Sequence, residues 1–364
     1  MGFRALPVIG RQFADSLESA RGDRGRCATC NTRVSADGQA DPGRMLRGAV
    51  VTFAVRRVAL GALLLVVVSL LSWIVFVPAI NPLWGYFAEP NAPNVVAMAK
   101  QAHLHDPLLV RYALWAKGLL TGQGFGRTVV HQQPIGPELR TALAHTCELI
   151  GFSLVIIIVG SVLVAAVEAR RRDSSIDVGL RATSYFIWSI PAFLLSLLVI
   201  HAVAAAPASW HLSGLAQGGP PTGPEDFFQR MTLPALVLAV GFIGAYSRYL
   251  RSSMLVGLQQ PYAWVARAKG LSEREVVRHH VLRNALVPFT TVMALDFGAV
   301  FGASIAVDVV FNLGGLASLA LNGINIADPF VIEAVIVVTA AIVVLVGIVG
   351  DLVCGWLDPR IRLT

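Results

Sequence analysis

The chain has 364 residues, of which 55% are hydrophobic and only 14% are charged, and its mean hydropathy is +0.66. A soluble domain carries about 25% charged residues, so this composition excludes an ordinary water-soluble protein and indicates a membrane protein. The net charge of +7 comes from basic residues concentrated on one side of the expected membrane topology. It therefore does not call for a nucleic-acid partner.

The first segment, residues 1–47, is polar and lacks apolar periodicity. It is expected to be a disordered cytoplasmic tail, and it is too polar for a secretory signal peptide. Cys27 and Cys30 form a CxxC pair in it. A structural zinc site needs four ligands, and no second pair stands nearby, so we expect an incidental pair, with a shared metal site or a redox role as alternatives. Met45 is an alternative start to Met1.

Six apolar segments follow, each close to the length of about 20 residues that a helix needs to cross a bilayer core. Three are free of ionisable groups for 17 to 20 residues, namely Val58–Val77, Leu149–Val167 and Ala334–Gly350. The alternating ten-residue segments of a β-barrel are absent from the sequence. We therefore predict an all-α polytopic membrane domain over residues 48–364. Its spans are expected near 57–79, 145–168, 180–206, 231–250, 285–310 and 330–354.

The basic residues predict the orientation. With six spans and a cytoplasmic N-terminus, 23 of the 29 lysines and arginines fall on the cytoplasmic side, as the positive-inside rule requires. Both termini are then cytoplasmic. Residues 80–144 form a long outer loop, in which Val95–Leu120 is predicted to be helical with a break at Asp106-Pro107, because a proline disfavours helical geometry in the residue before it.

Three residues inside the spans are candidates for a translocation pathway. Pro191 is expected to kink the third span, with Trp188 close by, and Asp296 is an intramembrane carboxylate, which usually faces a cavity or a partner. A plain packing kink and a helix–helix hydrogen bond without a transport role are the alternatives. Nearer the outer side, Asp308 is expected to be a structural cap and Glu333 a solvated side chain.

The largest cytoplasmic loop between spans, residues 251–283, is predicted to form two short helices hinged at Gly270. Pro261 suits the first turn of one helix, and Ser272 with Glu275 forms a capping box that starts the other. The second helix carries an apolar stripe beside basic residues. Such a stripe must be buried, either on anionic lipid headgroups or in the groove of a soluble partner. Its members are Val276, Val277, Val281 and Leu282.

This loop resembles the EAA loop of ABC-importer permeases, in the version found in the oligopeptide, dipeptide and nickel branch. The stretches ARAKGL (266–271) and HVLRNA (280–285) carry the resemblance, and the spacing matches the general pattern E-A-A-x-x-x-G, nine residues, then I-x-L-P. Trp264, Val265 and Arg283 depart from that pattern, as the peptide branch often does. Similar stretches, such as QPIGPELRTALAHTCEL, SIPAF and DPRIRL, extend the resemblance over nearly all of Arg56–Leu363, and they resemble the first of the two permeases in such importers.

The resemblance implies a non-catalytic permease in the bacterial cytoplasmic (inner) membrane that pairs with a second, homologous permease. Two ATP-binding-cassette domains, fused or separate, would bind ATP and Mg, and this chain would hold no cofactor and no metal. An extracytoplasmic binding protein, periplasmic or a lipoprotein, would deliver a peptide. The loop would dock on the ATPase, with its basic side chains pairing with acids there. The implied coupling residues are Ala266, Arg267, Lys269, Gly270, Leu271, Arg274, His280, Leu282 and Asn284.

Several alternatives stay open at this point. The substrate could be an oligopeptide, a dipeptide, a nickel chelate or another small solute. The sequence has no G-x-x-x-x-G-K-[ST] motif, so the energy must come from another chain. An ion-coupled secondary transporter would fit one intramembrane acid but leaves the cytoplasmic loop unexplained. An intramembrane enzyme needs H-E-x-x-H or a paired nucleophile and base, and no recognised pattern surrounds the serines and histidines in the spans.

Overall fold

The computed structural model describes residues 42–80, 96, 99–100, 103, 106–129, 131–171, 174–207, 218–221 and 223–357, with the side chains of 42–54, 224–225 and 352–357 excepted. Most of the predicted tail, with Cys27 and Cys30, lies outside these residues, as does most of the first half of the predicted outer-loop helix. The chain divides into two compact units, Met1–Val51 and Thr52–Thr364. The site and all the packing contacts reported lie in the second unit.

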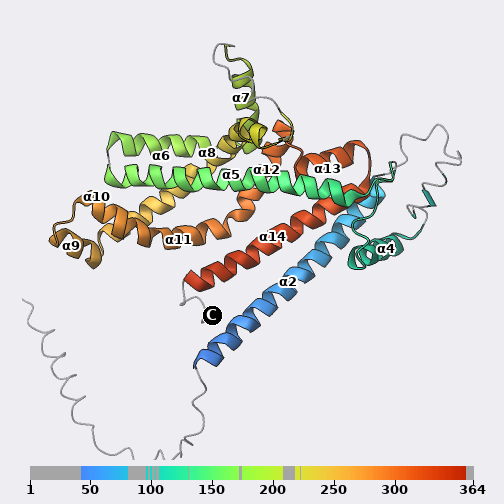
Figure 1. Ribbon diagram of the computed structural model, residues 1–364, viewed down its shortest axis with the longest axis horizontal. Coiled ribbons are helices and arrows are strands. Elements are labelled where there is room, and N and C mark those ends of the chain that lie inside the picture. Colours follow the sequence, from blue (N-terminus) through green and yellow to red (C-terminus); the bar gives the residue numbers. More distant parts are fainter. Residues whose placement is uncertain are drawn as a thin grey trace, which may run out of the picture. The chain divides into compact units, whose positions relative to one another are not determined.

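Over the described residues the regular elements are helices, with one isolated β-bridge between Arg127 and Pro134 (Figure 1). Four of the helices each contain an apolar stretch long enough to cross a membrane. They fall on the first, second, fourth and sixth predicted spans. The first of these helices begins earlier than expected, at Pro42, which lies inside the predicted tail. These helices are α2 (Pro42–Ala79), α5 (Ile135–Arg170), α8 (Pro224–Leu258) and α14 (Pro329–Leu357).

The third and fifth predicted spans are bent pairs of helices. In the third, α6 (Ser175–Trp188) and α7 (Ala192–Ala204) meet at 102°, so the kink expected at Pro191 is a complete break. In the fifth, a helix that runs from Glu273 to Leu295 meets α12 (Phe297–Phe311) at 56° beside Asp296. If each bent pair counts as one span, the described part of the chain has up to six.

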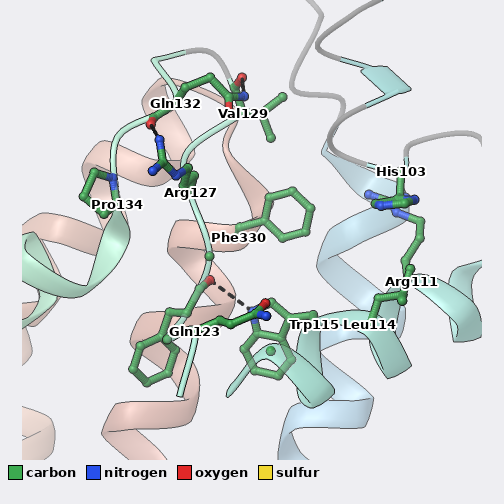
Figure 2. Close-up of a pocket in the computed structure, with 14 residues that line it drawn as sticks. His103, Arg111, Leu114, Trp115, Gln123, Arg127, Val129, Gln132, Pro134 and Phe330 are labelled. Carbon is green, nitrogen blue, oxygen red and sulfur yellow. Dashed lines mark hydrogen bonds between the residues drawn. The ribbon is translucent and has the colours of Figure 1, made fainter. Parts of the chain in front are cut away.

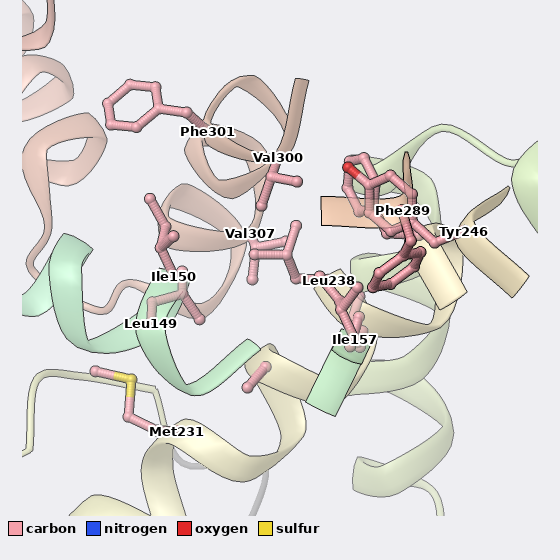
Figure 3. Close-up of a cluster of buried hydrophobic side chains, with 14 of the residues drawn as sticks. Leu149, Ile150, Ile157, Met231, Leu238, Tyr246, Phe289, Val300, Phe301 and Val307 are labelled. Atoms are coloured by element: carbon pink, nitrogen blue, oxygen red, sulfur yellow. The ribbon is translucent and has the colours of Figure 1, made fainter. Parts of the chain in front are cut away.

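Helix α8 is the centre of the packed core. It lies along α5 and also contacts α6 and both halves of the fifth predicted span. Figure 3 shows the buried side chains that meet around it, among them Leu238 and Ile157. Small residues allow the close approach, as is usual between membrane helices. A Cβ added to Gly244 would lie 2.7 Å from the Cβ of Ser184, and one added to Gly160 would lie 2.6 Å from Ile243.

Helices α2 and α14 run antiparallel and are joined at three levels. Arg57 and Asp351 form an ion pair of 2.9 Å, and a Cβ on Gly61 would lie 2.5 Å from Val344. The hydroxyl of Ser72 donates to both carboxylate oxygens of Glu333, at 3.0 and 2.8 Å. Glu333 is fully buried, so the prediction of a solvated side chain was wrong.

The predicted outer loop is held against α2 and α14 by aromatic contacts. Helix α4 (Leu108–Leu120) places Tyr112 and Trp115 with their ring centroids 5.7 and 5.4 Å from that of the fully buried Trp73 on α2. Phe330, at the start of α14, lies against the same indole at 5.8 Å. The indole N–H of Trp73 also donates to the backbone carbonyl of Leu108, at 3.2 Å.

Two buried aspartates, Asp308 and Asp328, accept hydrogen bonds from backbone N–H groups where helices begin. Asp308 accepts hydrogen bonds from the backbone N–H groups of Gly315, Ala317 and Ser318, at 2.9 to 3.0 Å, and so caps α13 (Leu316–Asn325), as predicted. Asp328 accepts from the backbone of Val129, Phe330 and Val331. Burial raises the pKa of Asp328, and these three N–H groups oppose that rise.

We predict that Asp308→Ala destabilises the protein by about 2–3 kcal/mol, because three backbone N–H groups and a serine hydroxyl lose their acceptor in a buried site. Thermal unfolding of the purified protein in detergent checks this. Asp308→Asn keeps one acceptor oxygen and should be affected less. Leu120→Ala, at a position 88% exposed at the end of α4, should leave the unfolding temperature unchanged, and equal effects from all three variants would contradict the assignment.

Candidate functional site

The loop 251–283 has the geometry that its sequence predicts. After α8 ends at Leu258, Pro261 occupies the first turn of α9 (Pro261–Ala268). The side chain of Ser272 accepts a hydrogen bond from the backbone N–H of Glu275, and the Glu275 carboxylate accepts one from the backbone N–H of Ser272. This capping box starts α10 (Glu273–Glu275), which continues into a π-helical segment (Val276–Val281) and then into α11 (Leu282–Leu295). Figure 1 shows α9 and α10 side by side at the tip of this region.

Gly270 forms the hinge between the two helices of the loop. Its φ is +83°, a conformation that glycine adopts readily and side chains with a Cβ rarely do. Its N–H donates to the carbonyl of Arg267 at 2.9 Å. A Cβ added at this position would meet no atom within 4 Å, so the backbone conformation, and not the available space, requires glycine here.

The π-helical segment was not predicted. The N–H of Leu282 bonds to the carbonyl of Val277, five residues earlier, where an α-helix would use the fourth. Residue types do not specify such a widened turn, which often marks a functional position inside a longer helix. Because the segment joins α10 to α11 without a break, the second helix of the loop and the first half of the fifth predicted span form one continuous helix.

The apolar stripe of the second helix is buried inside this chain. Val276, Val277 and Val281 all belong to the hydrophobic core, and Leu282 is half-buried. The prediction that this stripe covers lipid or a partner was therefore wrong. The reason is the close packing of the loop on the end of α8, where a Cβ on Gly257 would lie 2.8 Å from the hydroxyl of Tyr262 and 3.1 Å from Val281.

The apolar surface that stays open on the loop lies on α9 instead. The side chains of Trp264 and Val265 are 67% and 54% exposed, whereas Ala263 and Ala266 on the opposite face are buried. Trp264 and Val265 are two of the positions at which the sequence departs from the general EAA pattern. An indole exposed to this degree offers a large area for burial against another protein.

Not all basic side chains of the loop are free to pair with acidic residues of another protein. The guanidinium of Arg267 donates to both carboxylate oxygens of Glu273, at 2.9 and 2.8 Å, and this pairing raises the pKa of Arg267. Both side chains are exposed, so the pair is worth roughly 0–1 kcal/mol and serves to fix α9 relative to α10. Lys269 and Arg274 are exposed and form no ion pair with the described residues.

The other implied coupling residues are divided between the surface and the interior. Ala266 is buried, Leu271 and His280 are half-buried, and Asn284 is exposed. Asn284 lines a groove of about 330 Å³ between the end of α8 and the start of α11, together with Gln260 and Tyr262. The structure thus gathers these residues around one loop but presents only some of them to a partner.

A buried charge cluster lies next to the loop and was missed from the sequence. The guanidinium of Arg251, near the end of α8, donates to both carboxylate oxygens of Asp177 at 3.1 and 2.7 Å, and Arg181 lies 3.4 Å from the same carboxylate. Asp177 is fully buried in the first turn of α6. No sequence pattern connects two residues 74 positions apart, yet this pair ties α6 to α8 at Arg251, the first residue of the loop 251–283.

The pathway candidates lie away from the loop, at the two helix breaks. Trp188 ends α6 and packs edge-on against Phe242 of α8, with ring centroids 5.7 Å apart. Pro191 is the N-cap residue of α7, and its side chain is exposed. Asp296, between α11 and α12, is also exposed. The described residues therefore leave all three at least partly uncovered.

The predicted outer loop also contains a cavity of about 600 Å³, which Figure 2 shows between α4, the glycine-rich turn after it and the start of α14. Trp115 and Phe330 form its apolar wall, and Arg111 and Arg127 lie at its edges. Two guanidinium nitrogens of Arg111 are buried without a hydrogen-bond partner. Burial lowers the pKa of Arg111, and the charge of Asp106 opposes that shift.

Comparison with known proteins places the chain in a family. Residues 138–363 match the family described as "Binding-protein-dependent transport system inner membrane component". The chain is 30% identical to the oligopeptide transport system permease protein OppB of Mycobacterium tuberculosis over 86% of its own length and 99% of the relative's. It is 30% identical to AppB of Bacillus subtilis, another oligopeptide transport system permease, over 85% and 99%, and 26% identical to the metal-staphylopine import system permease CntB of Staphylococcus aureus over 85% and 98%.

These matches cover most of the chain and agree with a helical membrane domain that carries a hinged EAA-type loop. The described helices supply four to six candidate spans, and the loop lies within the matched region. The chain belongs to the binding-protein-dependent transport system inner membrane components, and it is a non-catalytic ABC-importer permease of the peptide and opine branch without a cofactor of its own.

Proposed function

We propose that this permease pairs with a second, homologous permease to form the pathway of a peptide importer, and that the loop 251–283 couples the pathway to the ATPase domains. The observation that carries the proposal is the hinge at Gly270. On one side of it stands α9 with Trp264 and Val265 exposed. On the other side stands a helix that continues without interruption into the membrane domain.

Docking of the loop on an ATPase domain would bury the exposed side chains of Trp264 and Val265 on α9. Burial of an indole and a valine side chain contributes roughly 1.5–3 kcal/mol each, which is larger than the contribution of exposed ion pairs on the rim. Lys269 and Arg274 are then better suited to set the orientation of the docked helix than its affinity. Arg267 acts within the loop, because Glu273 holds it.

Movement of α9 reaches the membrane helices by two routes. The first is the continuous helix from Glu273 to Leu295, which ends beside Asp296. The second is α8, which packs against α9 and holds α6 through the pair of Arg251 and Asp177. Each route ends at one of the helix breaks, so a displacement caused by ATP binding acts directly on the pathway candidates Trp188, Pro191 and Asp296.

The partners follow from the same proposal. Two ATP-binding-cassette domains, fused or separate, bind ATP and Mg, and an extracytoplasmic binding protein delivers the substrate. A peptide is the leading substrate, because the two relatives at 30% identity are oligopeptide permeases. The relative at 26% identity is named for metal-staphylopine import, so a small metal chelate is the second candidate.

We expect Gly270→Pro to leave membrane insertion intact and to uncouple ATP hydrolysis from uptake, because proline fixes φ near −65° and removes the N–H that bonds to Arg267. Uptake of labelled peptides of graded length by a deletion strain carrying the variant, together with ATPase activity of the purified importer, measures both quantities. Gly270→Asn is the matched control, because asparagine tolerates positive φ and should retain most of the coupling. Normal uptake in the proline variant would count against the role of the hinge.

We expect Trp264→Ala to weaken the association of the permease with its ATPase domains by about 10- to 100-fold, which corresponds to the loss of roughly 1.5–3 kcal/mol of buried indole. Its own folding should not change, because Trp264 is exposed in the single chain. Co-purification of the detergent-solubilised proteins at a series of protein concentrations measures the association. Leu120→Ala, at a position 88% exposed on α4, is the control, and the proposal fails if both variants associate as the wild type does.

A further inference from the structure

The cavity beside α4, which we call the α4 cavity, has the size of a small-molecule site and takes no part in the proposed coupling. Its volume of about 600 Å³ falls within the range of roughly 300–1,000 Å³ that is common for ligand pockets. Two contacts hold its walls in place. Trp115 and Phe330 both pack against Trp73, and the indole N–H of Trp115 donates to the carbonyl of Phe125 at 3.3 Å. The cavity is therefore part of the packed fold.

The charge of the cavity wall is positive. Figure 2 shows Arg127 and Arg111 at opposite edges of the cavity, with His103 close to Arg111. No carboxylate is among the described residues that line it. Asp106, the acid near Arg111 on the same segment, is outside the wall and forms a hydrogen bond of 2.8 Å with the His103 ring. The wall thus favours an anionic ligand.

Arg111 is the cation that its own chain leaves without an acceptor. Its Nε and Nη2 atoms are buried and have no hydrogen-bond partner. Its Nη1 atom has no partner among the described residues either, but it is not one of the buried nitrogens. Arg127, in contrast, donates from Nη1 to the backbone carbonyl of Gln132 at 3.1 Å. Unsatisfied donors cost a folded protein free energy, so this guanidinium calls for an explanation, and a ligand at the accessible Nη1 supplies one.

The rest of the wall suits an uncharged and largely apolar body. Trp115 and Phe330 present aromatic surface. Gly124 and Gly126 have φ values of +77° and +91°, and a Cβ added at either position would meet no atom within 4 Å. Their backbone therefore faces open space, and no side chain narrows the cavity at these two positions.

These features together select a carboxylate that is attached to a small apolar group. A guanidinium forms short, charge-assisted hydrogen bonds with a carboxylate, whereas the two arginines would repel an ammonium group. A bare inorganic anion would leave the aromatic surface uncovered. Every unmodified peptide ends in a carboxylate next to its last side chain, so its C-terminus carries both parts.

We propose that the α4 cavity binds the C-terminal carboxylate of a short peptide, with Arg111 as the residue that recognises it and the last side chain of the peptide against Trp115 and Phe330. The identity of the ligand as a peptide rests on the proposed function, whereas the preference for a carboxylate rests on the cavity alone. In the predicted orientation the cavity lies on the side from which the peptide is delivered. None of the three pathway candidates lines it.

The first test measures the unfolding temperature of the purified full-length permease in detergent, at constant ionic strength, with increasing alanyl-alanyl-leucine. A ligand that binds only the folded protein raises this temperature. The N-acetylated peptide, which keeps the carboxylate and lacks the ammonium group, should act as the free peptide does. The C-terminal amide should need at least about tenfold more peptide for the same rise, because it lacks the charged acceptor. An equal effect of the amide, or an effect that requires the free ammonium group, overturns the inference.

The second test changes the arginine in the same assay. Arg111→Gln should need about tenfold more peptide for the same rise, and Arg111→Lys, which keeps the charge without the planar fork, should lie between this variant and the wild type. Without peptide, Arg111→Gln should unfold at no lower temperature than the wild type, because the lost nitrogens have no partner in the fold. Arg140→Gln, at an exposed arginine outside the cavity, is the matched control and should behave as the wild type.

The outcomes separate this inference from the proposed function. A complete importer that takes up no radiolabelled alanyl-alanyl-leucine contradicts the proposed function, and the comparison of carboxylate with amide still decides the preference of the cavity. A wild-type peptide response in Arg111→Gln overturns the inference alone. A permease that no peptide stabilises, and that loses its extracytoplasmic binding protein on purification of Arg111→Gln, also overturns it, because Arg111 would then pair with an acidic side chain of that protein.

Discussion

The burial of Val276, Val277 and Val281 against the end of α8 is the interaction on which the account depends. Because these side chains lie inside the chain, the second helix of the loop cannot dock separately from the membrane helices. It is fixed to them, and it continues as α11. A force on α9 therefore moves a packed unit of the protein and not a free arm, which is what a permease without its own ATPase requires.

The same packed unit also includes α6, because an ion pair joins Asp177 of α6 to Arg251 of α8. Asp177 is fully buried and accepts two hydrogen bonds from the partly buried Arg251. Removing Arg251 would leave a buried carboxylate without this partner, which costs stability. Because Arg251 is the first residue of the loop 251–283, the pair connects α6, and hence the break at Pro191, to the movement that reaches Asp296 through α11. The two interrupted spans are thus attached to one element, the loop 251–283, and a row of aromatic contacts from Trp188 through Phe242 and Tyr246 to Phe289 packs α6 and α11 against α8.

Local features of this protein could be predicted from the sequence, and contacts between distant segments could not. Pro261, Gly270 and the pair of Ser272 and Glu275 act through their own backbone, so their roles follow from residue type and spacing. Apolar length located the spans. The burial of the valine stripe, the partner of Glu333 and the pair of Arg251 and Asp177 depend on which helices meet, and Ser72 lies 261 positions from Glu333. The π-helical turn and the completeness of the break at Pro191 likewise depend on packing that no local pattern specifies.

The central claim is that α9, α10 and α11 move as one rigid unit when ATP binds. Pulsed electron paramagnetic resonance tests it most directly, with spin labels at the exposed positions Ala268 on α9 and Val287 on α11, and a third at Val349 on α14. In the assembled importer the distance between Ala268 and Val287 should stay constant between the ATP-free and ATP-bound states, while the distance between Ala268 and Val349 changes. A change confined to the first distance would contradict the account.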